Sequence, residues 1–172
     1  MKTRFNHWYN ALAAFILSLL GFSSCGDNGG GGDMRFLYGT PTSSYHLKGN
    51  VTAEDGTPIQ GIKAVLIVDE NGYDGRPYDA RNIVPLDSAY SDSKGNFVTE
   101  DKGMTGTVDE LKRKKILKVV LKDEDGEANS GEFATDTIQS EDITIEQIKD
   151  RDGVWDLGSY EITANGKMKR KK

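Results

Sequence analysis

Few side chains in this 172-residue sequence are of the kinds that carry out chemistry. Cys25 is the only cysteine, and a cysteine thiol can be acylated, bind a metal or act as a nucleophile. His7 and His46 are the only histidines, the residue type that most often serves as a general acid or base near neutral pH. Several carboxylates cluster around Gly126, where oxygen atoms could coordinate a cation. The surroundings of these groups determine which chemistry each can perform.

The residues before Cys25 have the pattern of an export signal. Two basic residues near the N-terminus are followed by the apolar run 11–22 and by the small pair Ser23 and Ser24. The run is shorter than the ~20 apolar residues that a membrane-spanning helix needs. We therefore expect residues 1–24 to be a cleaved signal peptide.

The sequence FSSC (22–25) resembles the lipobox of bacterial lipoproteins, in which an apolar residue and two small residues precede a cysteine that is acylated and becomes the new N-terminus. The family prefers leucine where this chain has Phe22. The resemblance implies lipid on Cys25 and attachment to a membrane of the bacterial cell envelope, facing the periplasm or the cell surface. A secretory cleavage that leaves Cys25 free is the alternative, but an unpaired thiol is a liability in an oxidising compartment.

The segment 25–43 is expected to be a flexible tether, because 26–33 contains five glycines and no apolar side chain. Loss of the signal peptide leaves 20 basic and 27 acidic side chains, a net charge of −7. This balance argues against nucleic-acid binding by bulk charge. The basic end 167–172 predicts either a contact with an anionic partner or lipid, or a frayed, charged last strand that blocks edge pairing.

Residues 44–166 show the pattern of one all-β domain, an antiparallel Greek-key β-sandwich. The apolar run 64–68 predicts a central strand. One short helix is expected over 108–115, where acidic residues lead and basic residues follow. Dipeptides with glycine supply tight turns at residues 56, 72, 75, 95, 126 and 153. Apolar side chains alternate with polar ones at Tyr45, Leu47 and Val51, at Leu117, Val119 and Leu121, at Ile143 and Ile145, and at Tyr160 and Ile162.

Part of this domain resembles a known family, and the resemblance lies in GNVT (49–52), DGTPIQGI (55–62), the run 64–68 and SDSKGNF (91–97). These stretches resemble the carboxypeptidase regulatory-like domain. That family is a transthyretin-like β-sandwich found on exported bacterial proteins. The resemblance implies a strand, an Asp-Gly turn, a proline-anchored crossing and a buried strand, followed by a second glycine turn that directs Phe97 into the core.

A second resemblance covers nearly the whole chain. Four features carry this resemblance: the signal ending GFSSC (21–25), the motif YGTP (38–41), the strand 119–123 with the following EDGEAN (124–129), and the basic end. In these features the chain looks like the lipoproteins of Bacteroidetes that are encoded beside a radical S-adenosylmethionine enzyme. The activity of that family is itself unknown. The resemblance implies that the chain works with such an enzyme or is covalently modified by it.

No catalytic constellation is visible in the sequence. His46 is the only histidine after signal removal, so a histidine pair cannot bind a metal, and it lies on the polar face of its strand, where a solvated side chain is expected. Ser88, Ser91 and Ser130 lack the Gly-x-Ser-x-Gly signature of a serine nucleophile. We therefore expect no enzyme activity and no cofactor.

The carboxylates Asp123, Asp125 and Glu127 are spaced closely enough to raise the question of a calcium site. Their glycine follows the second aspartate directly, which does not fit the EF-hand spacing, so the pattern favours a hairpin turn. Residues 69–75 predict a polar loop for the same reason. A weak enzyme that uses only carboxylates, with a pair drawn from Asp123, Asp125 and Asp136, stays open, because pairing in space is not visible in a sequence.

The sequence thus favours a lipid-anchored, non-enzymatic module that acts in the cell envelope through a membrane contact at Cys25 and an envelope protein partner. Two alternatives stay open. The chain could be the substrate of the neighbouring radical enzyme, or a carbohydrate-binding module that uses Trp155, Leu157 and Tyr160, although aromatic side chains at that spacing are more often core. The sequence does not determine an oligomeric state.

Overall fold

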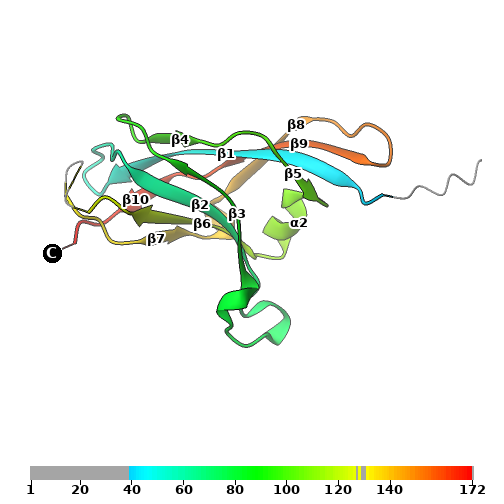
Figure 1. Cartoon of the computed structure of the whole chain (residues 1–172), viewed down its shortest axis with the longest axis horizontal. Coiled ribbons are helices and arrows are strands. Elements are labelled where there is room, and N and C mark those ends of the chain that lie inside the picture. Colours follow the sequence, from blue (N-terminus) through cyan, green and yellow to red (C-terminus); the bar gives the residue numbers. More distant parts are fainter. Residues whose placement is uncertain (1–38, 127, 129–130, 172) are drawn as a thin grey trace, which may run out of the picture. The chain divides into compact units, whose positions relative to one another are not determined.

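The computed structural model describes residues 39–126, 128 and 131–171, which form an all-β sandwich of two sheets (Figure 1). The predicted fold class is confirmed. The signal-like segment, Cys25 and most of the tether lie outside the described residues, as do Glu127 and Ser130. The strands are β1 (Thr42–Ala53), β2 (Ile62–Asp69), β3 (Ile83–Tyr90), β4 (Asn96–Val98), β5 (Lys102–Thr105), β6 (Leu117–Asp123), β7 (Asp136–Ile138), β8 (Thr144–Lys149), β9 (Asp156–Thr163) and β10 (Gly166–Met168).

The first sheet has six strands and is built around β1. β1 pairs in parallel with β9 and β10, and antiparallel with β4 and β5. β8 continues this sheet by pairing antiparallel with β9. The parallel pairs were not foreseen from the sequence. They form because the chain leaves β1, builds the whole second sheet, and returns to run in the same direction, as parallel strands require a long crossover.

The second sheet has four strands in the order β3-β2-β6-β7, all antiparallel. β2 contains the apolar run 64–68 and lies between β3 and β6, so the prediction of a central strand is confirmed. Edge strand β3 carries Pro85, whose missing N–H is tolerated at a sheet edge. The register of β2 on β3 shifts between Leu66 and Ile67, next to this proline.

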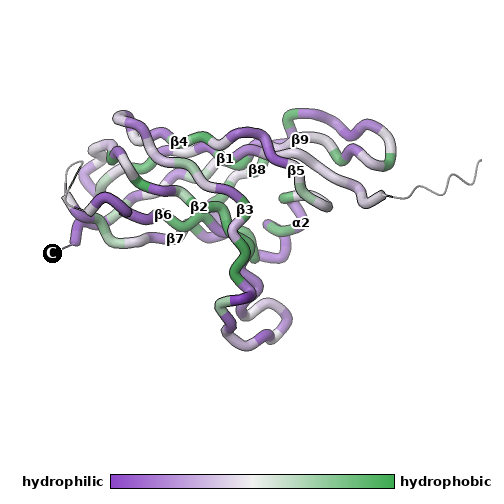
Figure 2. The backbone as a smooth tube through the Cα atoms, viewed as in Figure 1, coloured by the Kyte–Doolittle hydropathy of each residue, from purple (hydrophilic) through white to green (hydrophobic). Residues whose placement is uncertain are grey.

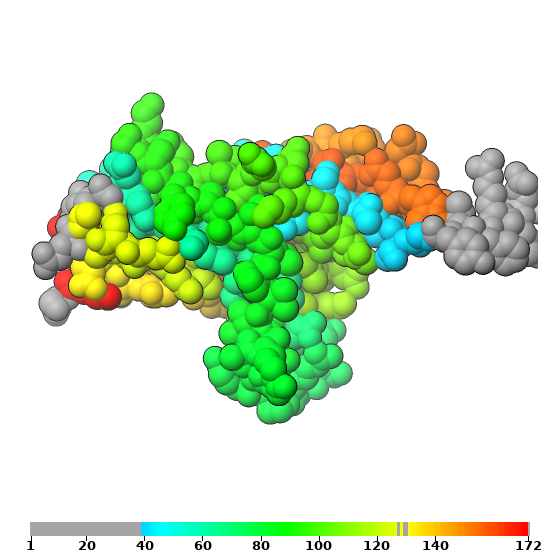
Figure 3. All heavy atoms as spheres, in the orientation of Figure 1, coloured from blue at the N-terminus to red at the C-terminus, as the bar shows by residue number. Residues whose placement is uncertain are grey.

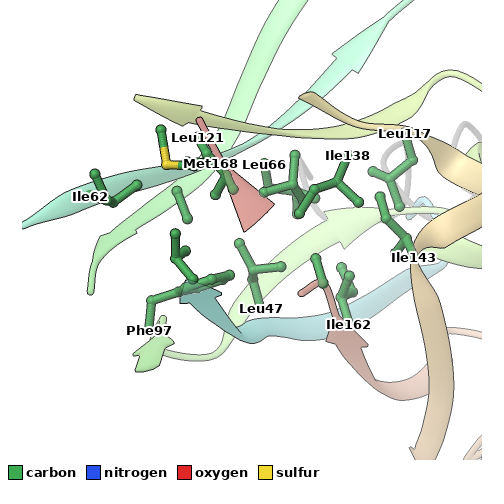
Figure 4. Close-up of a cluster of buried hydrophobic side chains, with 14 of the residues drawn as sticks. Leu47, Ile62, Leu66, Phe97, Leu117, Leu121, Ile138, Ile143, Ile162 and Met168 are labelled. Atoms are coloured by element: carbon green, nitrogen blue, oxygen red, sulfur yellow. The ribbon is translucent and has the colours of Figure 1, made fainter. Parts of the chain in front are cut away.

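The hydrophobic core lies between the two sheets, and side chains from both sheets point into it (Figure 4). Hydrophobic residues are interspersed with hydrophilic ones along the strands (Figure 2). Leu47 and Ile162 come from the first sheet, and Leu66 and Leu121 come from the second. All four side chains are fully buried. Phe97 is 2% exposed, which confirms that the second glycine turn directs it into the core.

The glycines predicted for tight turns, at residues 56, 72, 75, 95, 126 and 153, all have positive φ. At Gly95 the requirement is twofold, because φ is 77° and a Cβ atom would lie 2.3 Å from the carbonyl oxygen of Val51. Helix α2 (Val108–Arg113) falls inside the range predicted for a helix and buries Val108 against the core. In the described part of the chain, no helix is long and apolar enough to cross a membrane.

The basic C-terminal end is part of the sandwich. Met168 is fully buried in β10, and the backbone continues with hydrogen bonds from Ala134 N to Lys169 O and from Lys171 N to Glu132 O. The sandwich therefore extends beyond residue 166, and it begins at Thr42, two residues before the expected start. A frayed last strand does not describe residues 167–171.

Two valines provide a matched test of this core. Val119 in β6 is fully buried, whereas Val98 in β4 is 66% exposed. We expect Val119→Ala to lower the free energy of unfolding by about 2 kcal/mol, through lost burial and the cavity it leaves. Val98→Ala should change it by less than about 0.5 kcal/mol. Urea unfolding monitored by circular dichroism measures both, and equal effects of the two substitutions would contradict the packing described.

Candidate functional site

A groove of about 560 Å³ runs beside α2. Residues from four parts of the fold build it: α2 and its flanks, the 3₁₀ turn Ser140–Asp142, strand β8 with the turn that follows it, and strand β9. We call it the cationic groove. Its lining residues are Thr107, Asp109, Lys112, Arg113, Lys115, Ser140, Glu141, Gln147, Arg151 and Tyr160.

The lining carries four basic and two acidic side chains, a formal charge of +2 in a chain whose net charge is −5. Lys115 Nζ lies 3.0 Å from Glu141 Oε1, so this pair is largely neutralised. Lys112, Arg113 and Arg151 form no ion pair with another described residue. Positive charge is therefore left over in the groove to meet an anion.

Three polar uncharged residues of the groove are held in place by side-chain hydrogen bonds to the backbone. Ser140 is 2% exposed and its hydroxyl donates to Leu117 O. Tyr160 is 3% exposed and its hydroxyl donates to Leu157 O at 3.2 Å. Gln147 Nε2 donates to Lys149 O at 3.1 Å. The floor is thus pre-arranged, while the oxygen atoms of Tyr160 and Gln147 keep lone pairs that can accept hydrogen bonds.

His46 lies on the outward face of β1, as predicted, but it is not simply solvated. Its Nδ1 lies 3.0 Å from Asp101 Oδ1 and its Nε2 lies 3.1 Å from Glu161 Oε2. Lys48 Nζ lies 2.6 Å from the other oxygen of Glu161. Both ring nitrogens of His46 therefore lie within hydrogen-bond distance of carboxylates of this chain, so neither is left open to a substrate.

The carboxylate of Asp123 organises the loop that follows β6. Its Oδ1 accepts hydrogen bonds from the backbone N–H groups of Asp125 and Gly126, and its Oδ2 accepts one from Phe133 at 2.7 Å. These contacts match the predicted turn. Of the calcium candidates, Glu127 lies outside the described residues. Elsewhere in the described chain no three histidine, cysteine or acidic side chains are grouped so that they could hold a metal ion.

The polar loop predicted at 69–75 is part of a longer loop between β2 and β3, which projects from the sandwich (Figures 1 and 3). Asp69 anchors its base: Oδ1 accepts from Asn71, and Oδ2 lies 2.7 Å from Lys118 Nζ. Burial raises the pKa of Asp69, but the hydrogen bonds from Lys118 and Asn71 outweigh it and leave the pKa below its usual value.

The remaining residues considered as site candidates have structural roles or lie apart. The hydroxyl of Ser91 donates to Ile59 O and accepts from Ile62 N, so it ties the turn before β4 to the crossing into β2. Trp155 packs near the backbone of Gly39, where an added Cβ would lie 3.3 Å from the indole ring. Tyr160 is buried while Trp155 is half-buried, so the predicted aromatic set does not form one exposed patch.

Asp87 in β3 is a buried carboxylate that sequence reasoning did not single out. Its side chain is 6% exposed, and its Oδ1 lies 2.6 Å from Lys102 Nζ of the other sheet. Its Oδ2 has no hydrogen-bond partner among the described residues. Burial, and then the charge of Asp87, raise the pKa of Tyr45. The pair links β3 to β5 and is best explained as a clamp between the sheets.

The cationic groove was also missed from the sequence. The basic run 112–115 was used only as the end of a helix, and Arg151 stood alone in a turn. The one sequence feature that could have indicated the groove was the run of four basic residues at 112–115 in an otherwise acidic chain. Its partners on β8, β9 and the 3₁₀ turn are 25 to 50 residues away, so no local pattern could have connected them.

No protein-family model matches the chain, and no curated protein is significantly similar to it. A variant of catechol 1,2-dioxygenase from Acinetobacter radioresistens is similar at 16% identity and a TM-score of 0.43, over 75% of this chain and 52% of the enzyme. Hydroxyquinol 1,2-dioxygenase from Pseudomonas putida is similar at 11% identity and a TM-score of 0.42, over 92% of this chain and 71% of the enzyme. Shaft pilin SpaA from Lactobacillus rhamnosus is similar at 8% identity and a TM-score of 0.36, over 76% of this chain and 52% of the pilin.

The chain thus spans about half the length of the first dioxygenase and of the pilin. At these identities and TM-scores the similarities carry no conclusion about activity. The resemblances to the carboxypeptidase regulatory-like domain and to the lipoproteins encoded beside a radical enzyme stay predictions.

The ion pair of Lys48 with Glu161 beside His46 leads to a prediction about the titration of Glu161. The hydrogen bond from Lys48, and next that from His46, hold the pKa of Glu161 below its usual value. The resulting stabilisation is fully present above the pKa of glutamate in the unfolded chain, and it is lost as the pH falls through the folded-state pKa. We expect Lys48→Met to raise the pKa of Glu161, measured by NMR of the side-chain carboxyl carbon.

Lys169→Met is the control, because Lys169 Nζ lies 3.9 Å from Glu54 and belongs to another part of the surface. It should leave the Glu161 titration unchanged. A Glu161 midpoint that is the same with and without Lys48 would show that this ion pair does not form in solution.

Proposed function

We propose that this chain is a lipid-anchored, non-enzymatic β-sandwich of the bacterial cell envelope that acts as an interaction or accessory module. The order of features along the sequence supports the anchor: a signal-like segment, Cys25 behind two small residues, a glycine-rich stretch, and then a folded domain that begins at Thr42. Two or three acyl chains on one cysteine are enough for durable attachment, whereas a single chain holds only marginally.

The cationic groove is the observation that favours binding over catalysis. It is pre-arranged and keeps three unneutralised basic side chains. The groups that could exchange protons or hold a metal are committed elsewhere: His46 lies between two carboxylates, and Asp123 accepts hydrogen bonds from the backbone. A site with surplus positive charge and with no histidine or cysteine among its lining residues is suited to recognition.

The anchor is tested by mass spectrometry of the protein purified from its own host, as intact protein and as peptides, beside Cys25→Ala. We expect the wild-type protein to begin at Cys25 with acyl mass on that residue. Cys25→Ala should lack the acyl mass and should leave the membrane fraction. A Cys25 peptide without lipid would refute the anchor. Additional mass on another peptide would instead make the chain a substrate of a modifying enzyme, the alternative that the resemblance to radical-enzyme-associated lipoproteins implies.

A further inference from the structure

We infer that the cationic groove binds acidic saccharides, that is, polyhydroxylated ligands with carboxylate groups. This inference rests on the proposed function as an interaction module and names the class of ligand that the module takes. It does not depend on the lipid at Cys25.

The anionic part of the ligand is required by charge. Lys112 and Arg113 come from α2, and Arg151 comes from the turn between β8 and β9, so cationic groups enter the groove from two separate elements. Lys115 is paired with Glu141 and adds little. Arginine binds carboxylates through two parallel N–H groups, and at a groove of this kind such pairs are stronger than neutral hydrogen bonds.

Hydrogen-bond acceptors in the same lining favour a ligand that bears hydroxyl groups. Asp109 lines the groove and makes no ion pair with another described residue. The hydroxyl of Tyr160 and the amide nitrogen of Gln147 each donate a hydrogen bond to the backbone. Their oxygen atoms can still accept hydrogen bonds from a ligand. A carboxylate alone has no donors to offer them, whereas sugar hydroxyls both donate and accept.

Size and net charge exclude other anions. A volume of about 560 Å³ is in the range of sites for small organic ligands and is much larger than one phosphate needs. Long, densely charged polyanions are disfavoured, because the chain as a whole carries a net charge of −5 and repels them outside the groove. A short, moderately charged saccharide satisfies both limits.

The test is isothermal titration calorimetry of the mature protein in non-ionic detergent at low salt, with three probes. Tri-galacturonic acid carries both carboxylates and hydroxyls. Its methyl ester keeps the hydroxyls and removes the charge, and inorganic phosphate has charge without sugar hydroxyls. We expect tri-galacturonic acid to bind at least tenfold more tightly than either of the other probes.

Arg151→Gln and Lys112→Gln should each weaken the binding of tri-galacturonic acid about tenfold. Arg170→Gln is the matched control: Arg170 lies over the ring of Phe133 at 5.5 Å, outside the groove, and its loss should leave the affinity unchanged. Circular dichroism establishes that the variants are folded, which is expected because Arg151 is exposed in a turn.

Each other outcome overturns the inference in an identifiable way. Equal binding of the trimer and its ester would show that charge is not recognised. Phosphate binding as tight as that of the trimer would make the groove a simple anion site, and the interaction module would stand without a saccharide ligand. No binding of any probe, or equal loss in Arg170→Gln, would remove the groove as the site, while the mass of the Cys25 peptide decides the anchor separately.

Discussion

The hydrogen bonding of β1 is the constraint on which the rest of the structure depends. This 12-residue strand pairs with four others, so both sheet edges along its length are filled by separate pieces of chain. Two glycines permit that crowding. A Cβ atom on Gly49 would lie 1.8 Å from Ala164 O, and one on Gly95 would lie 2.3 Å from Val51 O. Any larger residue at either place would push a neighbouring strand away from β1.

The described basic side chains fall into two groups on the surface: those in ion pairs and those without an acidic partner. Most basic side chains are consumed in surface ion pairs such as those of Lys48 with Glu161 and of Lys149 with Asp156. Each such pair contributes little to stability. These pairs also neutralise much of the positive charge on the surface outside the groove. Three of the described basic side chains that form no ion pair, Lys112, Arg113 and Arg151, line the groove beside α2.

The candidate site shows where reasoning from the sequence stopped. Alternation correctly placed His46 on the outward face of its strand, but the partners that hold it, Asp101 and Glu161, are 55 and 115 residues away. The turn after β6 was predicted from its Asp-Gly pair, yet the contact of Asp123 with Phe133 was not. The groove was invisible for the same reason, since its unpaired positive charges come from α2 and from the turn after β8, which are far apart in the sequence.

The sequence by itself determined part of the local structure: the strands around residues 45–51, 64–68, 117–121, 143–145 and 160–162, the glycines that turn the chain, and the position of the short helix. Those features depend on neighbouring residues, through backbone conformational limits and the two-residue period of a half-buried strand. Only the tertiary structure decided that β9 and β10 run parallel to β1, that the basic end belongs to the sandwich, and that Lys112 and Arg151 share a groove. These outcomes depend on how two sheets bury a common core, and pairing between distant segments leaves no periodic mark in the chain.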